Sequence, residues 1–145
     1  MNQCYRNLPT PTTDSWALSA TGKVTLAFNP EAAEQVLSVP IRRYTPYTLN
    51  RPDQLLAALE QVRSSHLAFD REELRVGWSC VAAPIFGSDG SFLASIGVAA
   101  PTGRVRADLV AKQVATAAAS ISTNTVRSAA YRRRTDARLS LQAVR

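Results

Sequence analysis

Cysteine and histidine, the residues that build disulfides and most zinc sites, are scarce in this sequence. The 145 residues include two cysteines, Cys4 and Cys80, and a single histidine, His66. Because the cysteines are isolated and no CxxC pair occurs, we expect no disulfide framework and a reducing compartment. One histidine is too few for a zinc site of clustered His and Cys ligands, so neither a metal nor a cofactor is expected.

Long apolar runs are also missing. No stretch approaches the roughly 18 consecutive apolar residues that a membrane-spanning helix needs. The opening segment, residues 1–13, is polar and contains Pro9 and Pro11, so it lacks the apolar core of a signal peptide. We therefore expect a cytoplasmic protein with no membrane partner. The length predicts one domain that can bury a core without disulfides.

Acidic residues are fewer than basic ones, and the imbalance is concentrated at the end of the chain. Lys and Arg number 17 against 11 Asp and Glu, which gives a formal net charge of +6. Residues 127–145 contain six arginines and one acid, Asp136, and so carry +5 of that charge. Residues 1–126 are close to neutral, which argues against a basic nucleic-acid-binding surface on the body of the domain.

The front half of the chain predicts short helices after a polar lead-in over residues 1–15. Residues 19–28 suit a short helix or a strand equally well. Pro30 then starts a second helix over residues 30–37, with Glu31 near its positive N-terminus.

The clearest helix of the front half follows a linker over residues 44–50. We expect Asn50 to cap it and Pro52 to stand in its first turn. Spacings of four, three and four place its apolar residues on one face, which closes with the histidine: Leu55, Leu59, Val62 and His66.

The period changes from helical to alternating at Trp78. Residues 79–86 and 91–99 flank the turn sequence GSDG, which predicts a β-hairpin. Alternation in its second strand predicts two faces, of which one is small from residue 95 onward. The larger face is expected to hold Phe92, Ala94, Ile96 and Val98, and the smaller face Leu93, Ser95, Gly97 and Ala99.

A long helix is predicted over residues 106–132, rich in alanine over 115–119. Its expected apolar stripe is Val110, Val114, Ala117 and Ile121. The small face of the hairpin has two interpretations. In the first, a ligand lies against this face, since glycine inside a strand often marks the close approach of a ligand or another backbone. In the second and plainer interpretation, this alanine-rich helix packs into the space.

Several residues invite a chemical role that their surroundings do not support. Cys80 lies in an apolar strand, where a cysteine is usually a small apolar residue, and a nucleophilic role would require His66 as its base. The pair Gly22-Lys23 lacks the spacing of a phosphate-binding loop. Asp70 stands among other charged residues, which favours a solvated surface turn.

Three blocks, in this order and spacing, resemble the effector-binding domain of the IclR family. ALSATGKVTLAFNPE over 17–31 is similar to the family's A-T-x-x-G-K-x-x-L-A-x-x-P-E block. YTPYTLNRPDQLLAALEQVRSSHLAFDREE over 44–73 resembles the stretch that leads to D-x-E-E, and VAAPIFGSDGSFLASIGVAAPTGR over 81–104 resembles the two strands after it. The resemblance runs from about Trp16 to Arg127, and residues 16–130 are assigned to this domain.

The resemblance implies an α/β (α+β) fold of the GAF-like kind, an antiparallel sheet flanked by helices and ending in a long C-terminal helix. It implies a pocket for a small metabolite, an aromatic or short organic acid, and a homodimer or tetramer. DNA binding is implied only through a separate winged helix-turn-helix domain. Block by block, the implied ligand-binding positions are Ala20, Thr21, Asp70, Cys80, Gly97 and Ala99.

The chain departs from the family pattern at the last two of these positions. Members often carry polar residues there, whereas Gly97 and Ala99 supply no side-chain donor, so a bulkier or more apolar effector fits better. His66 stands where the family commonly has glycine. Both the winged helix-turn-helix and the first third of the effector domain are missing upstream of Trp16, so we expect a fragment or truncated product. Its exposed sheet edge favours an oligomer or a poorly stable monomer.

Two alternatives remain at this point. The basic tail over residues 131–145, YRRRTDARLSLQAVR, is a candidate for nucleic-acid binding or oligomerisation, although cations also suit a helix C-terminus. A small enzyme that uses Cys80 is the other alternative, and nothing near this residue in the sequence activates a thiolate.

Overall fold

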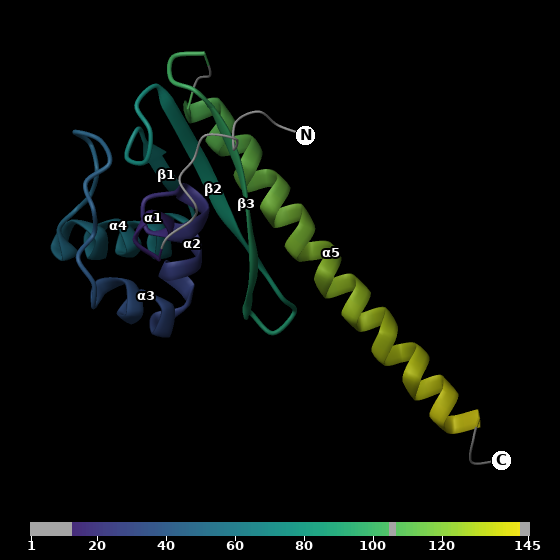
Figure 1. Ribbon diagram of the computed structural model, residues 1–145. Coiled ribbons are helices and arrows are strands. Elements are labelled where there is room, and N and C mark those ends of the chain that lie inside the picture. Colours follow the sequence, from purple (N-terminus) through teal and green to yellow (C-terminus); the bar gives the residue numbers. More distant parts are fainter. Residues whose placement is uncertain (1–12, 105–106, 143–145) are drawn as a thin grey trace.

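Three antiparallel strands form one sheet with helices on both faces in the computed structural model, which describes residues 13–104 and 107–142 (Figure 1). This arrangement confirms the expected fold class. The lead-in up to residue 12, with Cys4, and the side chains of the basic tail lie outside the described part. The elements are α1 (Thr13–Trp16), α2 (Ala20–Phe28), α3 (Pro30–Leu37), α4 (Pro52–Ser65), β1 (Ala68–Arg71), β2 (Trp78–Phe86), β3 (Phe92–Pro101) and α5 (Ala107–Gln142).

Local caps explain why residues 19–37 form two helices rather than a strand. Ser19 accepts a hydrogen bond from the backbone N–H of Gly22 at 3.0 Å and so caps α2. Asn29 ends α2 and caps α3 by accepting from the N–H of Ala32 at 3.1 Å. A Cβ on Gly22 would lie 1.7 Å from the Trp16 carbonyl oxygen, so only glycine fits this first turn of α2.

Helix α4 buries Leu55, Leu59 and Val62, as predicted. The predicted cap is wrong by one residue, because Arg51 holds the N-cap position and its side chain makes no capping hydrogen bond. His66 ends the helix in the left-handed region, with φ of 55°, and its N–H donates to the Val62 carbonyl at 2.8 Å. Glycine is the usual residue in this left-handed conformation at a helix end. Here His66 adopts it in place of glycine, and the helix ends at this position.

The sheet has the order β1-β2-β3. Asp70 on β1 stands opposite Cys80 on β2, and Cys80 stands opposite Ala99 on β3. The next row toward the hairpin turn consists of Ala68, Ala82 and Gly97. Because side chains alternate along a strand, both rows point to the same side of the sheet.

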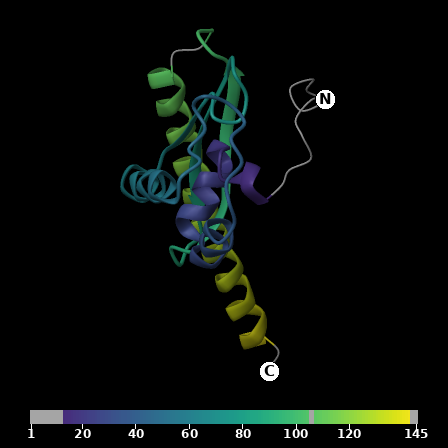
Figure 2. The same ribbon diagram turned by 60° about the vertical axis from the view of Figure 1, so that its left-hand side comes forward.

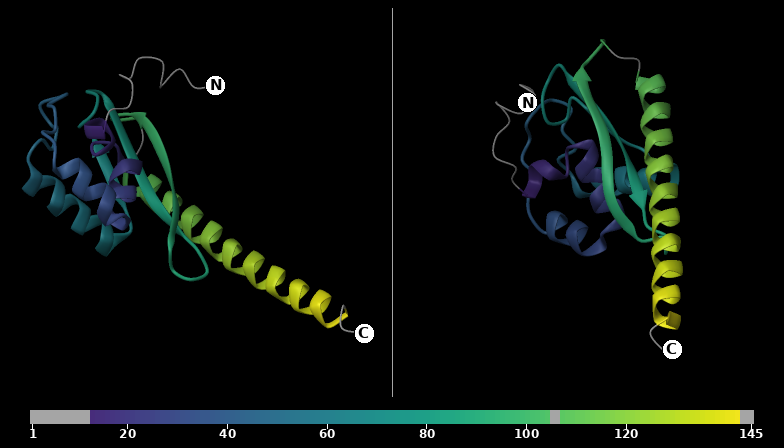
Figure 3. Two further views of the ribbon diagram at one scale, coloured as in Figure 1. Left: turned by 60° about the horizontal axis from the view of Figure 1, so that its bottom comes forward. Right: turned by 90° about the vertical axis from the view of Figure 1, so that its right-hand side faces the viewer.

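Different helices cover the two faces of the sheet, as the right panel of Figure 3 shows. Helix α2 contacts all three strands on one side, whereas α5 contacts β2 and β3 on the other. The core beneath α2 and α4 includes Val24, Leu26, Leu55, Leu59 and Ala82. The core beneath α5 consists of Val81, Ala83, Ile85, Ala111, Val114 and Ala118, with Leu67, Phe69, Ile96 and Val110 at its margin.

Two predicted apolar faces need correction. A register shift between Ile85 and Phe86 turns Phe92 away from the face of Ile96, and the Phe92 ring stacks on Phe28 at 5.8 Å instead. Of the predicted stripe of α5, Val114 is buried and Val110 packs at the margin of the core, whereas Ala111 and Ala118 are buried in place of Ala117 and Ile121.

Helix α5 is longer than the predicted 106–132. It continues to Gln142 and projects beyond the hairpin turn (Figures 1 and 2). Ser122 marks the last described hydrogen bond between this helix and the sheet, since its hydroxyl accepts from the Phe86 N–H at 3.0 Å. Within the described ranges, no helix is both long and apolar enough to cross a membrane.

Candidate ligand-binding site

The six predicted ligand-binding residues come together at the first turn of α2 and the sheet beneath it. We call the side of the sheet formed by Asp70, Cys80, Gly97 and Ala99 the site face. Ala20 and Thr21 open α2, and the Thr21 methyl carbon lies 3.2 Å from where a Cβ on Gly97 would stand. The Ala20 N–H interacts with the Cys80 sulfur. Residues up to 79 positions apart in sequence thus lie in one region of the fold.

Gly97 has no room for a side chain. A Cβ there would lie 2.8 Å from the Val81 carbonyl oxygen and 3.1 Å from the Ala82 Cβ, in addition to the contact with Thr21. The small face is therefore used in part for helix packing, but the helix is α2, and the expectation that alanine-rich α5 fills it is wrong. Gly97 and Ala99 stay exposed at the β3 edge, so this side of the site face is open.

Asp70 is buried rather than part of a solvated turn, contrary to expectation. It is 8% exposed, and its carboxylate accepts from the Glu73 N–H at 2.8 Å. Burial, assisted by the negative charge of Glu73, raises its pKa to about 6, although that hydrogen bond and Lys23 act in the opposite direction. A carboxyl group on the site face therefore changes charge close to neutral pH.

A buried ion pair links α2 to the segment after β1, next to the site face. The sequence patterns did not predict it. Lys23 of α2 donates to the Glu73 carboxylate at 2.5 Å and to the Phe69 carbonyl at 2.8 Å. Both side chains are buried, with 2% and 8% exposed. Only the surroundings of Lys23 hinted at burial, because its neighbours Val24, Leu26 and Ala27 are apolar.

The segment over residues 44–50 is more than the linker that was predicted. Thr45 and Thr48 are buried and donate hydrogen bonds to the turn after β1. The Thr48 hydroxyl donates to the Glu73 carbonyl at 2.7 Å, and the Thr45 hydroxyl donates to the Glu72 carbonyl at 2.7 Å. This YTPYT stretch therefore holds Glu73 in the position where it meets Lys23.

Cys80 lies at the centre of the site face with a deactivated thiol. Burial raises the pKa of the thiol to about 11, and the charge of Asp70 adds to this, while the Ala20 N–H and Lys23 oppose it. His66 lies away from it among aromatic rings, 5.4 Å from Phe86 and 5.8 Å from Phe28 between ring centroids. The geometry therefore gives the Cys80 thiol no base among the described residues.

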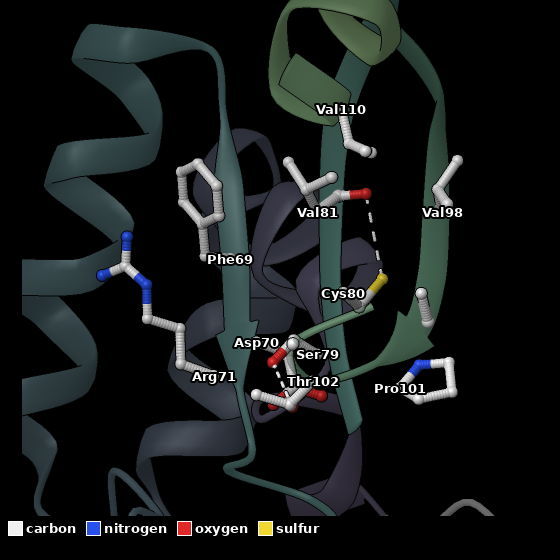
Figure 4. Close-up of a pocket in the computed structure, with 12 residues that line it drawn as sticks. Phe69, Asp70, Arg71, Ser79, Cys80, Val81, Val98, Pro101, Thr102 and Val110 are labelled. Atoms are coloured by element: carbon white, nitrogen blue, oxygen red, sulfur yellow. Dashed lines mark hydrogen bonds between the residues drawn. The ribbon is translucent and has the colours of Figure 1, made fainter. Parts of the chain in front are cut away.

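A cavity of about 70 Å³ adjoins the site at the open end of the hairpin (Figure 4). It lies chiefly on the α5 side, where Val81, Val98 and Val110 meet, although Asp70 and Cys80 also line it. This volume is well below the roughly 300–1,000 Å³ of ligand pockets. It does not include the other four predicted residues, so we do not identify it with the predicted site. Among the described residues, no cluster of His, Cys, Asp and Glu suits a metal ion.

Comparison with known proteins places these features in one family. Residues 16–123 match the family model described as bacterial transcriptional regulator IclR C-terminal. The HTH-type transcriptional repressor AllR of Escherichia coli K12 is 34% identical over 100 residues, which cover 66% of this chain and 37% of AllR. The HTH-type transcriptional regulator KdgR of Dickeya chrysanthemi is 36% identical over 109 residues, covering 72% of this chain and 36% of KdgR.

Solved structures agree with this match. The C-terminal domain of E. coli KdgR superposes with a TM-score of 0.67 at 31% identity, covering 77% of this chain and 71% of that one. A double mutant of the PobR inducer-binding domain from Acinetobacter, in complex with 3-hydroxybenzoic acid, gives 0.62 at 26% identity, covering 78% and 63%. The chain thus spans little more than a third of the curated relatives it matches.

Proposed function

The chain belongs to the IclR family of bacterial transcriptional regulators, within the C-terminal domain that binds effectors, and we propose that it senses a small organic acid. Effector binding on the site face would control the DNA binding of a winged helix-turn-helix domain that lies outside these 145 residues. A homodimer or tetramer in the cytoplasm is part of this proposal. The observation that carries it is the row of Asp70, Cys80 and Ala99 beneath the first turn of α2.

The chemistry of the site favours an acid with an apolar body. Of the first backbone N–H groups of α2, those of Ala20 and Gly22 already interact with the Cys80 sulfur and the Ser19 hydroxyl, and the partial positive charge of this helix end suits a carboxylate nearby. Gly97 and Ala99 offer a small apolar surface beside them, without a side-chain hydrogen-bond donor. A ring or short alkyl group therefore fits better than a second polar group. The benzoic acid bound by the PobR domain belongs to this class.

Thermal-shift and calorimetric titration with aromatic and short organic acids tests this proposal. We expect Ala99→Leu, on the site face, to weaken the binding of each hit by about tenfold or more, a loss of about 1.4 kcal/mol. Val98→Leu is the matched control, because the neighbouring side chain points to the opposite face of β3. Equal affinity of the two variants and the wild type would show that the site lies elsewhere.

The arginine-rich end of α5 supports a second, alternative function. The backbone of α5 continues as helix through residues 131–142, past the last described hydrogen bond to the sheet. Contact with nucleic-acid phosphates would make affinity fall steeply with salt. Deleting residues 131–145 and measuring DNA affinity over a salt series tests this function, which an unchanged affinity would exclude.

A further inference from the structure

A groove separates α4 from β1 at the edge of the sheet that lies opposite β3. We call it the α4–β1 groove. Its volume is about 370 Å³, which falls within the roughly 300–1,000 Å³ of ligand pockets. None of its lining residues is among the six predicted ligand-binding positions. The lining comes from the segment before α4, from α4 itself and from β1, and includes Tyr47, Leu49, Ala58, Val62 and Arg71.

The groove exists because α4 and β1 direct their larger side chains toward different cores. Leu59 of α4 packs in the core beneath α2, whereas Leu67 and Phe69 pack at the margin of the core beneath α5. Ala58 lines the space that remains between them and is too short to fill it. Every lining residue lies within residues 23–73, so this part of the chain forms the groove by itself.

Arg71 supplies a positive charge at the groove. Its side chain is exposed, and its guanidinium carbon lies 4.8 Å from the centroid of the Phe69 ring. Figure 4 shows both side chains on the side of β1 that faces away from β2. None of the ion pairs among the described residues involves Arg71. A guanidinium stacked on a ring holds its hydrogen-bond donors in a fixed plane, which suits a carboxylate.

The buried pair of Lys23 and Glu73 forms the inner end of the groove. The two charges of this pair offset each other, so Arg71 leaves the lining with a net charge of +1. The remaining walls are largely apolar, and a charge is screened less beside such walls than in open water. The α4–β1 groove therefore favours an anion over a neutral or positively charged molecule.

A small molecule fits this place better than an extended peptide does. Lys23 also donates to the Phe69 carbonyl at 2.8 Å, so this acceptor on the outer edge of β1 is already used. A strand that adds to a sheet needs the backbone groups of that edge. Strand β1 is also only four residues long and includes Asp70 and Arg71, and short, charged strands resist such pairing.

We propose that the α4–β1 groove binds a small monocarboxylate with an apolar body. The carboxylate pairs with the Arg71 guanidinium, and the body lies against Leu49, Ala58 and Val62. Burial of the body supplies affinity, and the charge-assisted hydrogen bonds to Arg71 select an acid over its neutral analogue. This site is separate from the site face, which lies on the α2 side of the sheet.

One short turn connects the α4–β1 groove to the site face. The Glu73 carboxylate pairs with Lys23 at the groove, while the Glu73 N–H donates to the Asp70 carboxylate at 2.8 Å. A ligand in the groove therefore changes the surroundings of a residue that holds Asp70. If an effector binds on the site face, the two ligands are coupled, and each changes the affinity of the other by the same factor. This coupling rests on the proposed function, whereas the groove site itself does not.

NMR titration of the full chain with hexanoate tests the site. We expect saturable shifts of the backbone amides of Leu49, Ala58 and Arg71. Hexanamide, which has the same body without the charge, should bind more weakly. Shifts confined to Ala20 and Ala99 would place the acid on the site face instead, and the absence of saturable shifts would show that the groove does not bind it. Either result would overturn the inference.

Matched variants separate a specific contact from general attraction of the acid to a basic chain. Arg71→Gln should raise the Kd for hexanoate about tenfold or more. Arg75→Gln is its control, because Arg75 carries an equal charge and is also stacked on a ring, but lies outside the groove lining. Ala58→Leu fills the groove and should weaken binding likewise, with Ala57→Leu on the exposed side of α4 as its control. Equal losses in a variant and its control would contradict the site.

One further variant keeps this inference apart from the proposed effector site. Ala99→Leu alters the site face and should leave the hexanoate-induced shifts at Leu49 and Ala58 unchanged. Loss of these shifts in Ala99→Leu would mean that they report binding on the site face, and would contradict a separate groove site. Failure of the effector proposal would leave the groove shifts in place.

Discussion

The two faces of the sheet are built from the same strands but from different kinds of side chain. Toward α5, branched and aromatic residues interlock with the helix, as Val81, Ile85 and Val114 do. Toward α2, the row of Asp70, Cys80 and Ala99 is small or polar. Large apolar side chains fill a core, whereas small ones let a helix terminus approach the sheet. The α5 face therefore serves stability, and the small or polar α2 face is where we propose that the ligand binds.

Charge sharpens this contrast. The α2 side holds Lys23, Glu73 and Asp70, all less than 10% exposed, and the described α5 core holds no charged residue. Buried charges are costly unless they are paired, and they are more common at functional sites than in plain cores. The predictions below test whether the α2 side depends on these groups in the way that the geometry requires.

The largest effect is expected from breaking the buried ion pair. Glu73→Leu leaves the Lys23 ammonium without its partner at 2% exposure, which should lower the free energy of unfolding by about 3–5 kcal/mol. Urea denaturation measures this change. The double variant Lys23→Met with Glu73→Leu removes both charges and should recover most of the loss. A double variant no more stable than Glu73→Leu would contradict this account.

Asp70→Asn is expected to remove a pH dependence of stability. The folded-state pKa of about 6 lies above the ordinary value of 3.8, so between these pH values the folded chain binds more protons than the unfolded chain. Stability should therefore fall as pH rises from about 4 to about 6, by at most about 3 kcal/mol. Denaturation midpoints across this range measure the slope, and an equal slope in wild type and variant would refute the assignment.

Adjacent substitutions on β3 compare the two faces directly. Gly97→Val forces a side chain against the Val81 carbonyl and Thr21, which should lower the free energy of unfolding by about 1–3 kcal/mol. Val98→Ala removes atoms from a side chain that is 45% exposed, and should cost less than about 1 kcal/mol. Thermal denaturation of both variants measures the difference. The opposite order would mean that the α2 side is the more loosely packed of the two.

The smallest effect on stability is expected at Cys80. Cys80→Ala should change the unfolding free energy by less than about 1 kcal/mol, since this residue is half-buried and makes no strong hydrogen bond. Its raised pKa should also slow labelling by a disulfide probe at neutral pH, relative to an ordinary cysteine. A Cys4→Ser background isolates this thiol. Labelling faster than that of a free thiol would revive a catalytic role.

Patterns close in sequence gave the most accurate predictions. The GSDG turn between two alternating segments predicted the hairpin, and Pro30 and Leu55 to Val62 predicted the helices that contain them. The errors arose where packing against other elements determines which side chains are buried. The stripe of α5 depends on packing against β2, and the orientation of Phe92 depends on its stacking on Phe28, far along the chain in both cases.

For the site, the residues were predicted but their surroundings were not. The family resemblance pointed to Asp70, Cys80 and Gly97, and the structure gathers them beneath α2. It gave no indication that Asp70 is buried or that Lys23 pairs with Glu73. Nor did it indicate that Thr45 and Thr48 donate hydrogen bonds to the turn after β1. Lys23 and Glu73 are 50 residues apart, beyond the reach of any local pattern.

The sequence by itself therefore determined the elements and the family, because turn residues, caps and apolar periodicity act over a few residues. Only the tertiary structure decided which helix covers which face of the sheet. That choice depends on the fit of whole surfaces: Thr21 of α2 fits above Gly97, whereas Val114 of α5 packs with Val81 and Ile85 on the other side.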